Sequence, residues 1–526
     1  MSTVRVSPRA EEVHAEVVVG IGPLTFDDLM SVARHGAPVR ISEHALAEVR
    51  RTRAVVDALA ADDQPHYGIS TGFGALATRH IPVEQRAQLQ RSLVRSHAAG
   101  SGPEVEREVI RALMLLRIST LATGRTGIRV ETLTTYVAML NAGITPVVHE
   151  YGSLGCSGDL APLAHCALAL MGEGVVRDGT GERRPTAEAY AVAGIRPVQL
   201  AEKEGLALIN GTDGMLGMLV LAITDLRRLL TIADITAALS VEGLLGTDDV
   251  FADDLQRLRP HPGQRDSAAN LRVLMSGSEI RESHHTDLCT RVQDAYSLRC
   301  APQVAGAVRD TLEHAARVAT IELGAAIDNP VITLDDRVES NGNFHGAPIG
   351  YALDFLAMAI ADLASMAERR TDRFLDASRS NGLPPFLAHD PGVDSGLMIA
   401  QYTQAAVVSE LKRLASPASV DSIPSSAMQE DHVSMGWSAG RKLRRAVDGL
   451  TRVLAIELLT AARGSELRAP LAPSPALGAV VTALRNAGVP GPGPDRWLSP
   501  EIDAVVTLII NGEVQAAAES VTGPLY

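Results

Sequence analysis

Four long segments after residue 214 are apolar on almost every side, and this feature restricts the fold more than any other. They cover residues 215–245, 302–327, 350–375 and 433–463, and their charged residues come in short clusters. Helices that are hydrophobic around most of their circumference pack inside a bundle or against partner subunits. The sequence therefore predicts a long central helical bundle.

Composition favours the same fold class. The 526 residues include only 7 Phe, 8 Tyr and 2 Trp, whereas Ala and Leu are abundant. Ala and Leu favour helices, while strands prefer aromatic and β-branched residues. We therefore expect a mainly α protein with one short strand or extended arm at residues 17–19. Residues 1–205 are expected to form an N-terminal, mostly helical domain, and residues 206–526 an elongated bundle for assembly with a C-terminal helical segment.

Charge and cysteine content exclude several classes of protein. The 48 basic and 62 acidic residues give a net charge of −14, which argues against a nucleic-acid partner. No C-x-x-C pair occurs among Cys156, Cys166, Cys289 and Cys300, so neither a disulfide framework nor a zinc ribbon is expected. Acidic residues near the N-terminus interrupt the apolar run that a signal peptide needs. The longest uncharged apolar stretch, 214–224, is shorter than the roughly 18–20 residues that span a bilayer. We expect a soluble, cytoplasmic protein with no membrane partner.

Polar stretches that contain glycine separate the helical segments. Loops held by rigid helices commonly carry binding and catalytic residues, so these stretches are the expected positions of the chemistry. The predicted loops are residues 67–74, 150–159, 205–214, 261–299, 340–346 and 417–431.

The tripeptide Cys156-Ser157-Gly158 stands directly before a predicted helix, with Asp159 as its expected N-cap and Gly172 after its end. From the residues alone, three interpretations remain open. It could be a plain turn of small residues, or Ser157 could be a hydrolase nucleophile, although the pattern Gly-x-Ser-x-Gly fails because glycine directly follows the serine. Alternatively, the tripeptide cyclises: the nitrogen of Gly158 approaches the carbonyl of residue 156, and loss of water leaves a methylidene group on the ring.

Two other patterns do not support a metal or an external cofactor. The adjacent His284-His285 pair and His261 lack a second cluster of ligands at metal-site spacing, so no metal is predicted. The run Gly20-Ile-Gly22 lacks the third glycine of a dinucleotide fingerprint, and the chain contains no Gly-Lys-Ser/Thr phosphate loop.

Seven loop motifs, found in the same order, resemble the aromatic amino-acid ammonia-lyases that carry a 4-methylidene-imidazol-5-one (MIO) group. The resemblance covers roughly residues 65–440 and is strongest to the histidine-specific members. Position 156 departs from the pattern, since most relatives have Ala there. The motifs are Tyr67-Gly-Ile-Ser-Thr-Gly-Phe-Gly, Ser96-His97-Ala-Ala-Gly, Gly152-Ser-Leu-Gly-Cys-Ser-Gly-Asp-Leu-Ala-Pro-Leu, Leu208-Ile-Asn210-Gly-Thr, Gln293-Asp-Ala-Tyr296-Ser-Leu-Arg299, Asn341-Gly-Asn-Phe344-His-Gly and Gln429-Glu430-Asp-His-Val-Ser-Met.

The resemblance implies an MIO ammonia-lyase-like fold and an MIO formed from Cys156, Ser157 and Gly158, with no external cofactor. Only the backbone carbonyl and Cα of residue 156 enter the ring, so a cysteine leaves this prediction intact. The implied reaction converts L-histidine to trans-urocanate and ammonia, the first step of histidine degradation, in a homotetramer whose active sites each draw on three subunits. The MIO is expected to capture the substrate amine, with attack by the imidazole left open. The alternative is a phenylalanine or tyrosine ammonia-lyase, or an MIO aminomutase.

The resemblance also implies roles around the reacting carbon and the substrate ring. Tyr67 is the expected general base for the β-proton, with Glu430 as the next candidate. His97 and Glu430 are expected to meet the imidazole nitrogens, whose hydrogen bonds must be replaced on burial. Phe344 is expected to line the ring pocket.

A second group of residues is expected at the substrate carboxylate. Arg299 would pair with it through its planar guanidinium, and Asn210 would donate to the MIO oxygen or the carboxylate. Gln293 and Tyr296 would support the MIO region and the carboxylate. On a helix, the spacing of 293, 296 and 299 would place these three side chains near one another.

Overall fold

The computed structural model describes residues 15–62, 64–285 and 292–526 and is mainly α-helical. The chain forms two compact units, each assembled from three stretches of sequence. The expected domains, 1–205 and 206–526, are each one continuous stretch of sequence, whereas each compact unit combines three stretches. The expected division into a domain with the tripeptide and a domain for assembly is therefore not tested by these units and stays a prediction. Unit 1 comprises Met1–Leu221, Arg317–Tyr351 and Ala418–Arg441, and unit 2 comprises Ala222–Ala316, Ala352–Pro417 and Lys442–Tyr526.

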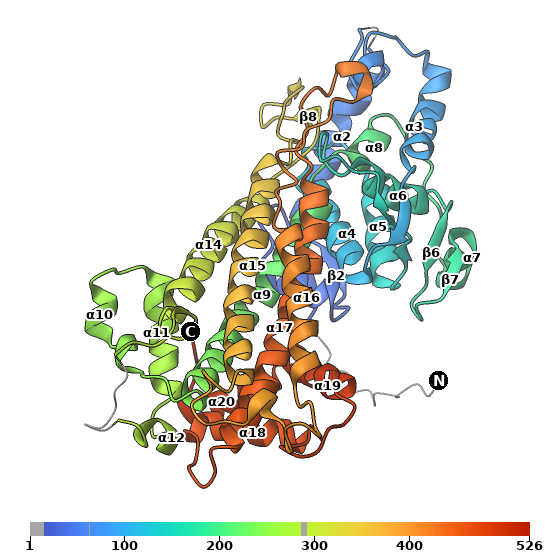
Figure 1. The fold of residues 1–526 in the computed structure, drawn as a ribbon. Helices are drawn as coiled ribbons and strands as arrows, with labels where there is room; N and C mark the ends of the chain where they lie inside the picture. The colour runs from blue at the N-terminus through green and yellow to red at the C-terminus, as the bar shows by residue number, and fades with distance from the viewer. Residues whose placement is uncertain (1–14, 63, 286–291) are drawn as a thin grey trace. The chain divides into compact units, whose positions relative to one another are not determined.

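All four apolar segments are helices, as predicted (Figure 1). Each of these helices has residues in both units. Within unit 2 they lie beside α16 (Met398–Leu414) as a bundle, joined by contacts such as Gln404 Nε2 donating to Val453 O (2.8 Å). A Cβ on Gly464 would lie 2.5 Å from the Phe374 ring, so the helices approach closely where glycine leaves room. The four helices are α9 (Asp213–Gly243), α14 (Ala301–Glu322), α15 (Ala347–Leu375) and α17 (Gly436–Glu466).

Unit 1 combines the remaining part of these helices with shorter ones. Their starts follow the sequence: Thr25 forms a capping box with Asp28, and the Ser42 hydroxyl accepts from the Ala45 N–H. Both N-caps satisfy amides that the first turn leaves unpaired. The helices are α1 (Phe26–Ala33), α2 (Glu43–Ala60), η1 (Gly74–Leu76), α3 (Val83–His97), α4 (Arg107–Ala122), α5 (Val130–Asn141), α6 (Leu160–Leu170), α7 (Thr186–Ala193), α8 (Glu204–Ile209) and η4 (Ser426–Met428).

The strands are short and form four small sheets, all in unit 1 among the described residues. The expected strand at residues 17–19 is confirmed: β1 pairs in parallel with β2, with Val17 opposite Val39. The other sheets are antiparallel: β3 with β5, β8 with β9, and β4-β6-β7 in that order. Their bounds are β1 (Val17–Val19), β2 (Val39–Ile41), β3 (Ser101–Glu104), β4 (Thr145–Pro146), β5 (His149–Tyr151), β6 (Val175–Arg177), β7 (Arg183–Pro185), β8 (Val331–Ile332) and β9 (Val338–Glu339).

The prediction that 261–299 is one loop is wrong. Pro262 opens a regular helix at its first position, where the missing N–H costs nothing. Further helices follow at 279–282 and 296–299. The other elements of unit 2 are η2 (Asp249–Phe251), α10 (Asp253–Arg257), α11 (Pro262–Leu274), α12 (Glu279–Glu282), α13 (Tyr296–Arg299), η3 (Pro385–Leu387), α18 (Pro475–Asn486), α19 (Ser499–Ile510) and α20 (Glu513–Thr522).

One described helix, α15, is long and apolar enough to cross a membrane by length and composition. Within its most apolar window, 61% of the residues are buried inside the protein, as in the core helix of a bundle. A search for uncharged runs overlooks this helix because Asp354 and Asp362 interrupt it.

Candidate active site

The turn before α6 holds Gly158 where no other residue fits. Its φ is +77°, a conformation that favours glycine, and it forms a parallel bridge with Gly211. A Cβ at this position would lie 2.0 Å from the Gly211 carbonyl oxygen. The missing side chain therefore allows two backbone segments to meet at the end of the tripeptide.

Asp159 occupies the N-cap position of α6, as predicted, but its side chain does not cap that helix. One carboxylate oxygen accepts from Ser153 Oγ (2.9 Å), and the other accepts from the Met215 N–H (2.9 Å) in the first turn of α9. Burial raises the pKa of Asp159 to about 7. This carboxyl group ties the reactive turn to the start of a long helix.

The other side of the turn is held by residues from far along the chain. Ser434 Oγ donates to the carbonyl of Gly155 (2.7 Å), and the Met435 N–H donates to the carbonyl of Leu154 (2.8 Å). The Gly346 N–H also donates to Gly155 O (3.3 Å). The turn is therefore fixed by all three chain stretches of unit 1.

Ser157 and Asn210 are brought together. The serine hydroxyl donates to Asn210 Oδ1 at 2.6 Å. Asn210 directly follows α8, and its own carbonyl accepts from Arg117 Nη1 (2.9 Å). Its Nδ2 donates to Asn329 O (2.9 Å), which leaves the amide oxygen for the serine.

Cys156, His97 and Glu430 form a second group. Burial raises the pKa of the Cys156 thiol to about 12, and the Glu430 carboxylate adds to the effect. Burial lowers the pKa of His97, although the Leu93 carbonyl and the negative charge of Glu430 oppose the shift. His97 Nδ1 lies 2.9 Å from Leu93 O, at the C-terminal end of α3. At neutral pH the carboxylate is thus associated with a protonated thiol and a neutral imidazole.

The loop that carries Glu430 has an unusual backbone. Ser426, Ala427 and Met428 have φ values of 52°, 53° and 69°, in the left-handed region that non-glycine residues rarely adopt. Ser425 and Glu430 close the loop as an antiparallel bridge, and Ser425 Oγ donates to Glu430 Oε2 (3.0 Å). Backbone of this kind persists where the surroundings enforce it, often at functional sites.

Tyr67 is half-buried in a turn anchored by its neighbour Ile69. Ile69 is fully buried against Val56 of α2 and Ile332 of β8. The Tyr67 hydroxyl accepts from the Gly74 N–H (3.2 Å), and the following helix η1 packs against η4, next to the Glu430 loop. The tyrosine is thus held by unit 1.

Phe344 is also half-buried in unit 1, in the loop between β9 and α15. This loop is tied to Asp328, whose carbonyl accepts from Asn341 Nδ2 (3.0 Å), and to the reactive turn through Gly346. Its lining role stays a prediction.

Gln293, Tyr296 and Arg299 lie in unit 2, and their predicted common helix is only partly correct. Helix α13 begins at Tyr296, so Gln293 precedes it in non-helical backbone. The Arg299 guanidinium lies 4.7 Å from the Tyr296 ring centre, and Tyr296 is 69% exposed. In the part of the chain that the structure describes, the buried Nε of Arg299 has no hydrogen-bond partner. The two units are described separately, so the contribution of these residues to the same site stays a prediction.

Sequence analysis missed the charged groups behind Asn210. Lys203 Nζ and Asp328 Oδ2 form a completely buried ion pair at 2.5 Å, and Arg117 lies 3.6 Å from Asp213. Lys203 and Asp328 are 125 residues apart, so no local periodicity connects them. No signal in the sequence indicated this pair.

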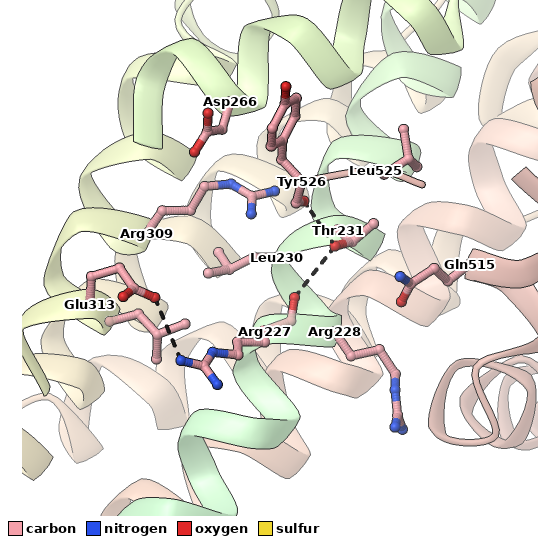
Figure 2. A pocket seen from close by; sticks show the side chains of 11 residues that line it. Arg227, Arg228, Leu230, Thr231, Asp266, Arg309, Glu313, Gln515, Leu525 and Tyr526 are labelled. Atoms are coloured by element: carbon pink, nitrogen blue, oxygen red, sulfur yellow. Dashed lines mark hydrogen bonds and ion pairs between the residues drawn. The ribbon is translucent and has the colours of Figure 1, made fainter. Parts of the chain in front are cut away.

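Other polar groups of unit 2 do not belong to this arrangement. His284, weighed above as a metal ligand, has its ring nitrogens 3.3 and 3.2 Å from the carbonyls of Ile280 and Gly246. No group of three or more potential ligands that could hold a metal occurs in the part of the chain that the structure describes. A pocket of about 460 Å³ beside the C-terminus contains none of the predicted site residues (Figure 2). Arg227 and Glu313 in its wall pair with each other at 3.8 Å.

Comparison with known proteins identifies the class. Residues 24–486 match the Aromatic amino acid lyase family, and the chain belongs to it. Among curated relatives, the histidine ammonia-lyase of Streptomyces coelicolor is 66% identical over 509 residues, which cover 97% of this chain and 99% of that protein. The histidine ammonia-lyase of Gloeobacter violaceus is 50% identical over 503 residues, covering 95% and 97%.

Solved structures give the same fold. A tyrosine aminomutase from Streptomyces globisporus superimposes with a TM-score of 0.91 at 38% identity, covering 97% of this chain and all of that chain. A histidine ammonia-lyase from Trypanosoma cruzi has a TM-score of 0.88 at 38% identity, with coverage of 96% and 95%. The fold expected from the loop motifs is confirmed.

Proposed function

We propose that this chain removes ammonia from L-histidine to give trans-urocanate, and two curated relatives at 65% and 66% identity are named histidine ammonia-lyases. The observation that carries the proposal is the turn at 156–158, where Gly158 has no room for a side chain and the Ser157 hydroxyl is bound by Asn210. The reaction is difficult because the β-proton is barely acidic and an amine is a poor leaving group. A site for it needs an electrophile and a base.

The electrophile in this proposal is an MIO formed from Cys156, Ser157 and Gly158. These residues fit the group, since ring formation requires the nitrogen of residue 158 to approach the carbonyl of residue 156, and a Cβ at 158 would strike Gly211. When formed, the group supplies an electrophilic methylidene that makes the substrate amine a better leaving group. The protonated Cys156 thiol has no part in the chemistry.

The base in this proposal is Tyr67, which takes the β-proton. Its hydroxyl accepts a hydrogen bond from a backbone N–H, so the oxygen has a fixed position. Glu430 is the second candidate, and its carboxylate belongs to the same unit.

The substrate carboxylate in this proposal binds Arg299, with Gln293 and Tyr296 in support; Asn210, whose NH₂ group is held by Asp328 and Asn329, serves the tripeptide instead. Among the described residues, the buried Arg299 Nε has no partner, and Tyr296 is exposed, which suits residues that complete a site with other groups. As the family resemblance implies, we propose a homotetramer in which subunits share active sites. We further propose that the protein works in the cytoplasm, with no nucleic-acid or membrane partner.

Substrate choice depends on His97 and Glu430. A phenylalanine pocket need only be apolar, whereas buried imidazole nitrogens require partners. A neutral histidine and a carboxylate can supply a donor and an acceptor. Sites built to hydrogen-bond a polar group reject analogues that lack it by up to about 10⁴–10⁵-fold.

The test is product formation from L-histidine, followed by the near-ultraviolet absorbance of urocanate, beside L-phenylalanine and L-tyrosine in competition. We expect urocanate as the main product, and His97→Phe or Glu430→Gln to reduce its formation without preventing ring closure at 156–158. Preference for phenylalanine or tyrosine would contradict the substrate. The likeness to a tyrosine aminomutase makes a β-amino acid product the second outcome to examine, and that product would replace the lyase assignment.

A further inference from the structure

Behind Asn210 lies an ion pair that none of the proposed roles uses. Lys203 and Asp328 meet at 2.5 Å, with side chains 1% and 0% exposed. Burying two opposite charges is a poor source of stability, because the loss of hydration offsets most of their attraction. Stability alone therefore does not explain this pair, and its position behind Asn210, which binds Ser157, points to another role.

The Asp328 carboxylate determines which end of the Asn210 amide faces Ser157. Asp328 Oδ1 lies 3.4 Å from Asn210 Nδ2, which also donates to Asn329 O at 2.9 Å. With the NH₂ group between two acceptors, the amide oxygen is left for the serine hydroxyl. A reversed amide would place its oxygen against a carboxylate and a carbonyl, which is electrostatically unfavourable.

Lys203 connects the pair to the Tyr67 turn. Its Cδ lies 3.6 Å from the place where a Cβ on Gly68 would stand, so the aliphatic stem packs beneath that turn. Its backbone has a φ of +71°, at the N-cap of α8, the helix that ends at Asn210. A left-handed backbone conformation at a fully buried lysine persists only because the surrounding structure enforces it.

We propose that Lys203 and Asp328 are positioning residues for the cyclisation of Cys156, Ser157 and Gly158, acting through the orientation of Asn210. The inference rests on the proposed function, since it concerns how the electrophile is made. The Asn210 oxygen holds the Ser157 hydroxyl in one orientation while the turn reacts.

The reaction balances without an external reagent. The Gly158 nitrogen bonds to the carbonyl carbon of Cys156, and that carbonyl oxygen leaves as water with the hydrogens of the amide nitrogens of Ser157 and Gly158. Ser157 then loses its Cα hydrogen and its hydroxyl as a second water. Nothing is oxidised or reduced, so the rate depends on geometry.

The experiment follows the mass of the peptide that spans 156–158 in full-length protein at intervals after a pulse of synthesis. The main variant is Lys203→Met with Asp328→Leu, which removes both charges and leaves neither unpaired. We expect it to keep a cooperative thermal transition while its ring closure slows by about tenfold or more, the effect of losing one buried hydrogen bond. Asp328→Asn removes only the charge of the carboxylate, and its ring closure at 156–158 is also expected to be slow. This variant replaces the double variant in the experiment if the double variant does not fold.

The matched control is Lys442→Met with Asp354→Leu in unit 2, a pair at 2.6 Å with side chains 18% and 1% exposed. It should affect thermal stability but not the rate of ring closure. A folded Lys203/Asp328 variant that matures at the wild-type rate would overturn the inference and leave the proposed function standing. If the wild-type peptide itself never becomes lighter by two waters, the proposed function fails first.

Discussion

Unit 1 and unit 2 each bury a salt bridge, and the two differ in what their carboxylates hold. In unit 2, Glu457 accepts from Arg370 Nε (2.5 Å) and from the hydroxyls of Thr236 and Ser240 (2.8 Å each). These partners come from the helices α9 and α15, while Glu457 itself lies on α17. In unit 1, the carboxylate of Asp328 instead faces the amide that binds Ser157. Similar charge burial thus joins helices in one unit and supports a reactive turn in the other.

The largest difference in turnover should be between a serine variant in unit 1 and a serine variant in unit 2. Ser157→Ala should keep the fold but lose nearly all turnover, and its peptide should lack the loss of two waters, because the methylidene carbon comes from this side chain. The matched control is Ser465→Ala in unit 2, a buried serine whose hydroxyl has no hydrogen-bond partner among the residues that the structure describes. Activity of Ser157→Ala near that of the control would contradict the proposal.

Tyr67→Phe should reduce kcat by roughly 10²–10⁴-fold, the usual contribution of a general base, while ring closure proceeds. Tyr402→Phe in unit 2, at an exposed site on α16, is the control and should be neutral. Steady-state kinetics and peptide mass distinguish the two effects. A decrease of only a few-fold would move the proton acceptor elsewhere, with Glu430 the next to test.

Arg370→Met should lower the free energy of unfolding by about 3–5 kcal/mol, because Glu457 is left buried and unpaired. Turnover per folded molecule should stay unchanged. Denaturant titration of this variant beside Arg370→Met/Glu457→Leu checks the cause, since removal of both charges should recover much of the loss. If the double variant is no more stable than the single one, an unpaired charge is not the reason.

The two units should share one pH effect. Burial raises the pKa of Asp159 in unit 1 and of Glu242 in unit 2 to about 7 in each case. The folded protein keeps these protons while the unfolded chain releases them near pH 4, so the stability that they give is present below about pH 4 and is lost as the pH rises to about 7. The loss is at most about 3–4 kcal/mol for each group. Asp159→Asn and Glu242→Gln should each flatten the pH dependence of unfolding, and an unchanged slope in either would remove that residue from the effect.

The smallest effect expected is on substrate binding. Arg299→Lys keeps the charge but loses the planar guanidinium, so KM for L-histidine should rise by about tenfold. Arg452→Lys, in a partly exposed pair with Asp448, is the matched control. A KM within error of wild type would exclude Arg299 from the carboxylate site.

The sequence was sufficient for features set by local pattern. Continuous apolarity predicted α9, α14, α15 and α17, and the order of glycine and small residues predicted the turn at Gly158. The sequence was not sufficient where residues far apart in the chain determine the contacts of a side chain or the start of a helix. Asp159 looks like an ordinary N-cap, yet its carboxylate binds Met215, and Gln293 fits a helical spacing that begins only at Tyr296. The ion pair of Lys203 and Asp328 has no local signature, because the fold alone brings it together.

Because unit 1 is assembled from three separate stretches of the chain, its parts are synthesised at different times. The tripeptide leaves the ribosome long before Gly346, Ser434 and Met435, whose groups hold the turn at Leu154 and Gly155. A nascent chain that ends before residue 418 therefore carries the tripeptide without the contacts from Ser434 and Met435. Under the proposed function, the electrophile would form in a fully held turn only after most of the polypeptide has been synthesised.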